Sequence, residues 1–161
     1  MKAFAAKTSI RATPERIWAL LTYAAGYPRW NNTVEKVAGL IARGERVTVH
    51  PKINPGRVFP IKVTAYEPPY RMVWTGGMPL GLFTGERTFT LQPGSDGDVE
   101  FSMREEYTGL MAPLIGRSIP DLQPAFNEFA SDLKRAAEVN PGARQEQRWQ
   151  RKQASKRIRG S

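Results

Sequence analysis

Alternation of apolar and polar residues continues with few breaks from Thr33 to Tyr107, and this pattern limits the fold more than any other feature. Neighbouring side chains of a strand point to opposite faces, so a period of two indicates a sheet with one buried face. The turn formers Pro68-Pro69 and residues 94–97 separate consecutive segments and favour hairpins. The sequence therefore predicts about six consecutive antiparallel strands.

The segment that precedes this region predicts one more strand and two short helices. Residues 4–12 alternate as a half-buried strand. Thr13 is then suited to N-cap a helix with Pro14 in its first turn, and the apolar stripe that follows ends at Thr22. Turn formers and aromatic residues at positions 26–32 predict a second helical turn before the strands begin.

A long amphipathic helix is predicted near the end of the chain. Its apolar residues recur at steps of four, three, four and four: Leu122, Phe126, Phe129, Leu133 and Ala137. The opposite face is expected to carry Glu128, Asp132, Lys134 and Arg135. Because such a helix must bury its apolar stripe against another element, this order of elements predicts an α+β fold in which the helix covers one sheet face.

The 161 residues suit one domain, and most of the net charge of +9 lies in a tail. Residues 144–161 contribute +6, which leaves the body nearly balanced and unlike a basic nucleic-acid platform. Asn140-Pro141-Gly142 ends the periodic pattern, so we expect a domain at residues 1–140 and a basic, disordered tail at residues 141–161. The tail is either a solvated extension or a weak contact for anionic lipid or nucleic acid.

Several classes of site are excluded by composition. Without cysteine the chain has no disulfide, thiolate nucleophile or iron-sulfur cluster, and a single histidine excludes a multi-histidine metal site. We therefore expect no metal and no cofactor. No apolar run reaches the roughly 20 residues of a membrane span, and the first residues do not form a signal peptide, so a cytoplasmic location is expected.

Two ionisable residues, Arg87 and Glu105, fall on the inward parity of their strands. If Phe89 lies opposite Met103, Arg87 faces Glu105 directly, whereas a register shifted by two makes them diagonal neighbours. Either register allows an ion pair. A charge on a buried face must be paired or hydrated, so the pair is either a structural salt bridge or part of a wet cavity.

In the second interpretation the pair orients a carbonyl, hydroxyl or carboxylate of a ligand. Tyr107 has the same parity and could donate its hydroxyl to the same ligand. His50 has the outward parity, so no histidine is expected among the inward residues. Residues 76–81 are either an entrance lid or an ordinary hairpin loop.

The chain resembles the START-related SRPBCC superfamily, which includes polyketide cyclase and dehydrase relatives. The resemblance covers about residues 3–138 and rests on residues 12–21, Tyr27-Pro28-Arg29-Trp30-Asn31, Trp74-Thr75-Gly76, residues 81–89 and Glu105-Glu106-Tyr107-Thr108-Gly109. Tyr23 and Asn32 depart from the residues that many members have there. Close relatives often have histidine at the position of Arg87, so a histidine-dependent role does not carry over.

This resemblance implies a helix-grip fold, in which a curved antiparallel sheet wraps around the long C-terminal helix. It also implies a cavity between sheet and helix for a hydrophobic or amphipathic small molecule, either lipid-like or aromatic and polyketide-like. The residues expected to line it are Trp30, Phe59, Trp74, Phe83, Arg87, Phe89, Phe101, Met103, Glu105, Tyr107, Leu122, Phe126 and Phe129.

Binding without catalysis is the favoured function, because no inward residue has an ordinary pKa near neutrality. The alternative is a cofactor-independent aromatase, cyclase or dehydratase of the polyketide type, in which Arg87, Glu105 and Tyr107 orient the substrate and shuttle protons. A third class is an interaction module that binds a macromolecule through its tail or its sheet surface.

Overall fold

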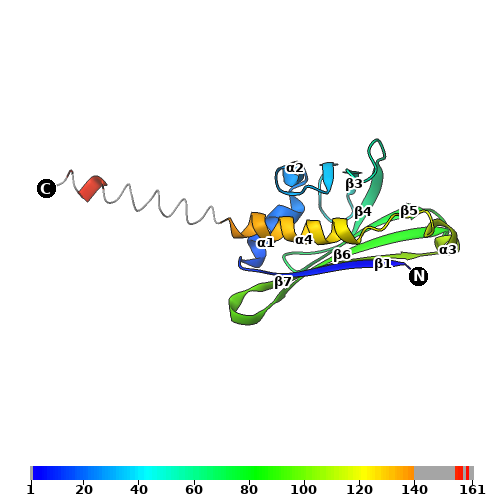
Figure 1. Ribbon diagram of the computed structural model, residues 1–161. Coiled ribbons are helices and arrows are strands. Elements are labelled where there is room, and N and C mark those ends of the chain that lie inside the picture. The colour runs from blue at the N-terminus through cyan, green and yellow to red at the C-terminus, as the bar shows by residue number, and fades with distance from the viewer. Residues whose placement is uncertain (1, 140–154, 158, 160–161) are drawn as a thin grey trace.

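The computed structural model describes residues 2–139, 155–157 and 159, and its main body is a sheet with helices on one face (Figure 1). The strands are β1 (Ala3–Ile10), β2 (Val34–Ala38), β3 (Arg46–Pro51), β4 (Phe59–Glu67), β5 (Arg71–Met78), β6 (Phe83–Pro93) and β7 (Val99–Thr108). The helices are α1 (Pro14–Thr22), α2 (Tyr27–Trp30), α3 (Ala112–Ile115) and α4 (Gln123–Glu138), with 3-10 turns at Ala24–Gly26 and Ser95–Gly97.

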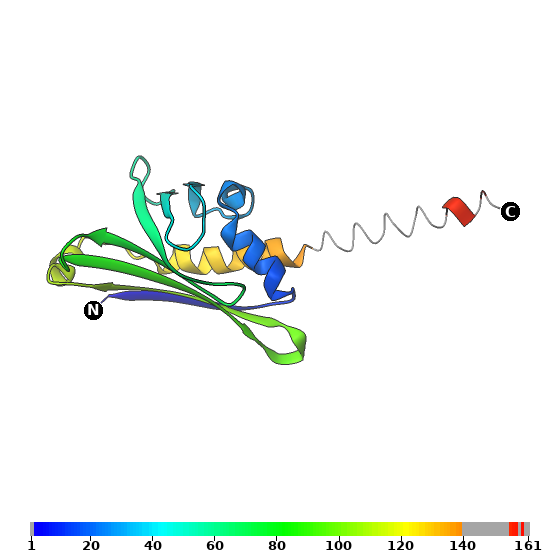
Figure 2. The ribbon, with the colours of Figure 1, turned by 180° about the vertical axis from the view of Figure 1, so that it is seen from behind.

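All seven strands form one antiparallel sheet in the order β1-β7-β6-β5-β4-β3-β2. Strands β2 to β7 follow one another as hairpins, and β1 closes the sheet beside β7. The sheet curls around α4, which lies along its inner face (Figures 1 and 2). The predicted α+β class and the helix-grip fold are therefore confirmed.

The predicted ends of helices and strands are accurate where an N-cap residue or a clear hydrophobic period marks them. Helix α1 begins at Pro14 and ends at Thr22 as predicted, and the Arg16 N–H donates to Thr13 Oγ1 at 3.2 Å. Strand β1 ends at Ile10 instead of residue 12. Of the two registers left open for β6 and β7, the structure has the one in which Phe89 lies opposite Met103 and Arg87 opposite Glu105.

The apolar stripe of α4 is buried as predicted, but the prediction for Asp132 is wrong. Phe126, Phe129, Leu133 and Ala137 are buried, whereas Leu122 is half-buried at the N-cap. Asp132 was expected on the outer face and is only 2% exposed. Its carboxylate accepts a hydrogen bond from the Asn32 N–H at 2.8 Å and another from the Arg135 guanidinium, so its charge is paired. Asp132 thereby fastens the segment after α2 to α4.

Side chains of α4 also occupy free backbone groups at the edge strand β1. Gln123 Nε2 donates to the Ala5 carbonyl at 2.6 Å, and the Ala5 N–H donates to Gln123 Oε1 at 3.4 Å. The Lys134 ammonium donates to the carbonyl of Ser9. The Arg11 N–H, just beyond the strand, donates to Glu138 Oε1 at 3.0 Å. Helix α4 therefore both fills the inner face and covers one edge of the sheet.

The C-terminal end of α4 is capped by a side chain from α1. Arg16 Nε donates to the Ala137 carbonyl at 2.6 Å, and Arg16 Nη2 donates to the Val139 carbonyl. The predicted boundary at residue 140 and most of the basic tail lie outside the described residues, so the division into domain and tail stays a prediction. Residues 155–157 and 159 are helical. Within the part of the chain that the structure describes, no helix is both long and apolar enough to cross a bilayer.

Candidate functional site

The centre of the candidate site is the ion pair between Arg87 on β6 and Glu105 on β7. These residues are Cα partners on adjacent strands, and Arg87 Nη2 donates to Glu105 Oε2 at 3.0 Å. The Arg87 guanidinium also lies 4.8 Å from the centre of the Phe126 ring of α4, a cation–π contact. The Arg87 and Glu105 side chains retain 21% and 15% exposure. Water therefore reaches the pair although it belongs to the inner face.

Tyr107 lies two residues beyond Glu105 on the same face of β7. Its ring stacks on Phe83 at a centroid distance of 5.6 Å and meets Phe4 edge-on at 6.4 Å. The partner of Tyr107 across the strands is Gly85, and a Cβ at Gly85 would lie only 3.3 Å from the ring. Glycine at this position therefore leaves room for the tyrosine ring against the sheet.

Burial raises the pKa of the Tyr107 hydroxyl well above its usual value, and the Glu105 carboxylate raises it further, although Arg87 opposes the shift. Tyr107, protonated at neutral pH as tyrosines ordinarily are, can donate a hydrogen bond. Together Phe83, Arg87, Glu105, Tyr107 and Phe126 form a region that we call the polar half of the inner face. It can orient an oxygen-bearing group beside an apolar surface.

A second region, the aromatic half, surrounds Phe129 of α4. The Phe129 ring lies between 5.5 and 6.3 Å, centre to centre, from four other rings, and Trp74 joins the cluster at 4.8 Å from Phe89. The members of the aromatic half are Tyr27, Trp30, Trp74, Phe89, Phe101 and Phe129. Phe89, Phe101 and Phe129 are at most 2% exposed, so these rings pack against one another.

Three buried nitrogen donors in or beside the aromatic half make no hydrogen bond among the described residues: Trp30 Nε1, Asn31 Nδ2 and Trp74 Nε1. A buried donor without an acceptor costs roughly 1 to 3 kcal/mol. Trp74 is the Cα partner of Arg87 across β5 and β6, so it borders the polar half. An unpartnered indole donor on the residue next to Arg87 suits a ligand that carries an acceptor oxygen.

The structure distributes the sequence-predicted residues between these two halves, with three exceptions. Met103 is buried beside Phe89, its Cα partner on β6, and belongs to the general core. Leu122 precedes α4 and is half-buried. Phe59, at the start of β4, is 41% exposed, so the predicted inward position does not bury it. That these residues contact a ligand stays a prediction.

The sequence analysis missed the polar cluster around Asp132, which includes Asn31 and Asn32. Asn31 Oδ1 accepts from the Thr33 N–H at 2.8 Å and from the Thr33 hydroxyl at 2.6 Å, while Asp132 accepts from Asn32. The available signal was the position of Asp132, three residues after Phe129 and adjacent to Leu133, at the margin of the apolar stripe. The cluster orders the chain between α2 and β2.

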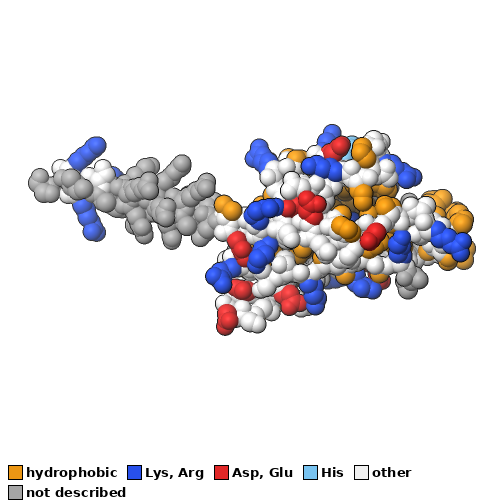
Figure 3. Space-filling model, in the orientation of Figure 1, with side chains coloured by type: hydrophobic (Ala, Val, Ile, Leu, Met, Phe, Trp, Pro, Cys, Tyr) orange, Lys and Arg blue, Asp and Glu red, His pale blue; other side chains and the backbone are white. Residues whose placement is uncertain are grey.

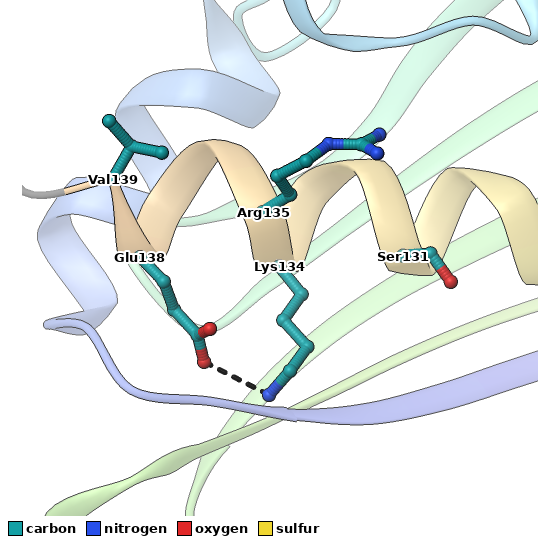
Figure 4. A pocket seen from close by; sticks show the side chains of 5 residues that line it. All are labelled: Ser131, Lys134, Arg135, Glu138 and Val139. Carbon is teal, nitrogen blue, oxygen red and sulfur yellow. Dashed lines mark hydrogen bonds and ion pairs between the residues drawn. The ribbon is translucent and has the colours of Figure 1, made fainter.

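A pocket of about 390 Å³ lies at the C-terminal end of α4, away from both halves (Figure 4). It is lined by Ser131, Lys134, Arg135, Glu138 and Val139. Lys134 and Glu138 form an ion pair at 2.9 Å, and both also contact backbone groups at β1. The hydrogen bonds from Arg11 and Lys134 lower the pKa of Glu138. These polar groups are engaged in structural contacts, so this pocket is not the predicted site.

No metal centre emerges from the residues that the structure describes. Within residues 2–139, 155–157 and 159, no three histidine, cysteine or acidic side chains come close enough together to hold an ion. His50 lies on β3 and is half-buried.

Known families and solved structures share this architecture. Residues 1–138 match the family described as polyketide cyclase / dehydrase and lipid transport. Protein MLL2253 from Mesorhizobium loti has 22% identity and a TM-score of 0.65, with 83% of this chain and 95% of that chain covered. A START superfamily protein from Mycobacterium smegmatis has 14% identity and a TM-score of 0.60, with 84% and 97% covered.

The hypothetical protein jhp0584 from Helicobacter pylori has 10% identity and a TM-score of 0.69, with 85% of this chain and 88% of that chain covered. At these identities the likeness shows the fold alone. A search among curated proteins found no match.

Proposed function

Because the chain belongs to the polyketide cyclase, dehydrase and lipid transport family, we propose that it binds a hydrophobic or amphipathic small molecule between the sheet and α4. The observation that carries this proposal is the partly accessible Arg87–Glu105 pair on an otherwise apolar face. An ion pair on a buried face costs desolvation free energy, and apolar residues of similar volume often stabilise a fold as well or better. A pair that water still reaches is available to a ligand.

The chemistry of the two halves supports a ligand with an apolar body and an acceptor group. Phe126 provides apolar surface against the Arg87 guanidinium, and Phe83 provides it against the Tyr107 ring. Arg87 and the protonated Tyr107 are donors, and the unpartnered Trp74 indole borders them. A carbonyl or carboxylate oxygen matches these donors, so a lipid-like acid and a polyketide-like ketone are both candidates.

The alternative function is a cyclase or dehydratase that uses Arg87, Glu105 and Tyr107 on a poly-carbonyl substrate. The proximity of these three residues favours it. The ion pair between Glu105 and Arg87 opposes it, because a general base must be free to accept a proton. Turnover of a poly-β-ketone analogue that Tyr107→Phe abolishes without weakening its binding would support the enzyme.

The proposal is tested with the full chain and its variants at the ion pair. Native mass spectrometry of protein from its own host should reveal a bound apolar compound. The anionic probe 1-anilinonaphthalene-8-sulfonate should bind the wild type, and Arg87→Met should weaken its affinity about tenfold by removing a charge-assisted contact. Arg104→Met is the matched control, because Arg104 pairs with Glu106 on the outer face, where both side chains are exposed.

Equal probe affinity in Arg87→Met and Arg104→Met would contradict a ligand site at the inner pair. A protein that carries no compound from its host and binds no apolar probe would contradict the binding function as a whole. We also propose a cytoplasmic location and a weak contact between the basic tail and anionic lipid or nucleic acid.

A further inference from the structure

One end of the molecule exposes leucines from two adjoining loops. We define the apolar tip as residues 78–82, the last residue of β5 and the loop to β6, and residues 109–117, which follow β7 and include α3. Leu80 is 94% exposed, Leu110 is 84% exposed and Leu114 is 63% exposed. Hydrophobic side chains gather at this end in the space-filling view, over the position of α3 (Figures 1 and 3). Exposed apolar residues that cluster in this way indicate an interaction surface.

The two loops of the apolar tip are held together by backbone hydrogen bonds. The Leu110 N–H donates to the Gly81 carbonyl at 3.2 Å, and the Met111 N–H donates to the Leu82 carbonyl at 2.8 Å. Leu80 has a φ of 62°, a left-handed conformation that is unfavourable for a bulky side chain. Leu80 therefore lies in a defined turn that is hydrogen-bonded to the neighbouring loop. Its exposure is a feature of that turn.

The charge of the apolar tip is positive. Arg117 is the one ionisable residue in residues 78–82 and 109–117, and its side chain is exposed. Lys2 adjoins the tip, because its ammonium donates to the carbonyls of Gly116 at 3.3 Å and Ile119 at 2.7 Å. Exposed leucines beside cations, with no acidic residue in residues 78–82 and 109–117, match the interface of an anionic bilayer, which accepts apolar side chains below its negative headgroups.

We propose that the apolar tip docks on an anionic lipid membrane by inserting Leu80, Leu110 and Leu114. A second copy of the chain fits this surface less well. A stable protein interface buries roughly 800 Å² on each partner, which is more than a few side chains at the narrow end of the body provide. A second copy would also bring its Arg117 to the same surface. A bilayer needs no complementary shape.

The first test measures sedimentation of the full chain with vesicles of phosphatidylcholine alone or mixed with phosphatidylglycerol. The wild type should bind the phosphatidylglycerol vesicles more strongly. The triple variant Leu80→Ser, Leu110→Ser and Leu114→Ser should bind them on the order of tenfold more weakly, because it loses the inserted apolar area. Leu40→Ser is the matched control, since Leu40 is 66% exposed in another loop. Every variant keeps the basic tail.

The second test uses the absence of cysteine from the chain. A polarity-sensitive fluorophore attached at Leu110→Cys should shift its emission to the blue when phosphatidylglycerol vesicles are added, and the same label at Leu40→Cys should not. Vesicle binding by the triple variant equal to that of the wild type would overturn the proposal. Equal shifts at both labels would overturn it too. A shift at Leu110→Cys that appears without vesicles when the protein concentration is raised would indicate self-association and would also overturn it.

Failure of this proposal is distinguishable from failure of the ligand site. Arg87→Met should bind vesicles as the wild type does, and the triple variant should keep its affinity for the anilinonaphthalene probe. A triple variant that also loses its cooperative thermal unfolding would have lost its fold. The single variant Leu110→Ser, at an exposed position, would then decide the question by a threefold or larger loss of vesicle binding.

Discussion

The aromatic half and the polar half occupy the same face of the same sheet and differ in how tightly their side chains are packed. Around Phe129 the rings meet one another and are almost fully buried. Around Arg87 an ion pair keeps partial exposure beside Phe126. In a close-packed core, small changes of volume are costly, whereas a hydrated pair tolerates changes of partner. We therefore propose that the aromatic half mainly provides stability and that the polar half contacts the ligand.

The largest effect is expected for Phe129→Ala in the aromatic half. Removing this ring should lower the free energy of unfolding by about 3 to 5 kcal/mol, because four neighbouring rings lose their contacts and a cavity remains. Urea denaturation measures the loss. Leu40→Ala, at an exposed loop position, should change stability by less than about 0.5 kcal/mol. A loss below about 1.5 kcal/mol for Phe129→Ala would mean that the aromatic half is not the stabilising region.

A smaller loss, about 2 kcal/mol, is expected for Asp132→Ala. The change leaves the Asn32 N–H without its acceptor and loosens the segment after α2 from α4. The matched control is Glu128→Ala on the exposed side of the same helix, which should have little effect. Equal melting temperatures for the two variants would contradict a structural role for Asp132.

Alkaline pH should weaken the fold through both halves. Burial raises the pKa of Tyr27 in the aromatic half and of Tyr107 in the polar half above the ordinary value of about 10. Above pH 10 the unfolded chain releases these protons first, so stability falls with rising pH, by up to about 1.4 kcal/mol per pH unit for each tyrosine. The full contribution is present below pH 10.

Melting temperatures between pH 9 and pH 11 measure this effect. Tyr107→Phe should make the decline shallower than in the wild type. Tyr70→Phe, which removes an exposed hydroxyl, should leave the decline unchanged. The same slope in Tyr107→Phe and the wild type would show that Tyr107 ionises freely in the folded protein.

Glu105→Gln is expected to cost about 1 kcal/mol or less, because water can solvate the remaining Arg87. If the pair were purely architectural, the loss would be about 3 to 5 kcal/mol. Thermal unfolding distinguishes the two values before any ligand is known. Glu106→Gln, which alters the exposed pair on the outer face, is the control. A protein unfolded at ordinary temperature by Glu105→Gln would remove the pair from the ligand site.

The smallest effect is expected from truncation after Val139. Neither half extends beyond this residue, and the Arg16 contacts to the carbonyls of Ala137 and Val139 are retained. The melting temperature should change by no more than about 2 °C, as measured by circular dichroism. A larger decrease would show that the tail packs on the body.

Sequence reasoning predicted the fold well where periodicity and capping act locally. Thr13 and Pro14 set the start of α1, and period two placed Arg87 and Glu105 on the same inner face, although it left two registers open. The same reasoning could not tell which inward aromatic residues pack against one another. Inward parity is shared by Phe89, which is buried, and Phe59, which is exposed, because burial also depends on the element that lies across the sheet.

Asp132 shows a second limit of sequence reasoning. An acidic residue on a helix is usually solvated, and its burial here depends on a backbone N–H of Asn32, 100 positions away in the sequence. The apolar tip was not predicted, and residues 76–81, which overlap it, were interpreted only as a lid or a hairpin loop, since the hydrogen bonds that join the two segments of the tip are contacts between distant residues. Such tertiary contacts leave no periodic signal along the chain.

The covering of β1 by Gln123, Lys134 and Glu138 has a consequence for assembly. Growth of a fibril by strand addition requires two free edges on every copy, one to receive a neighbour and one to offer. In this sheet α4 side chains bind the backbone groups of Ala5 and Ser9 on β1, so strand addition is favoured at β2, at the opposite end of the strand order. Two copies joined through β2 expose only β1 edges that α4 obstructs, and association of that kind favours a closed pair.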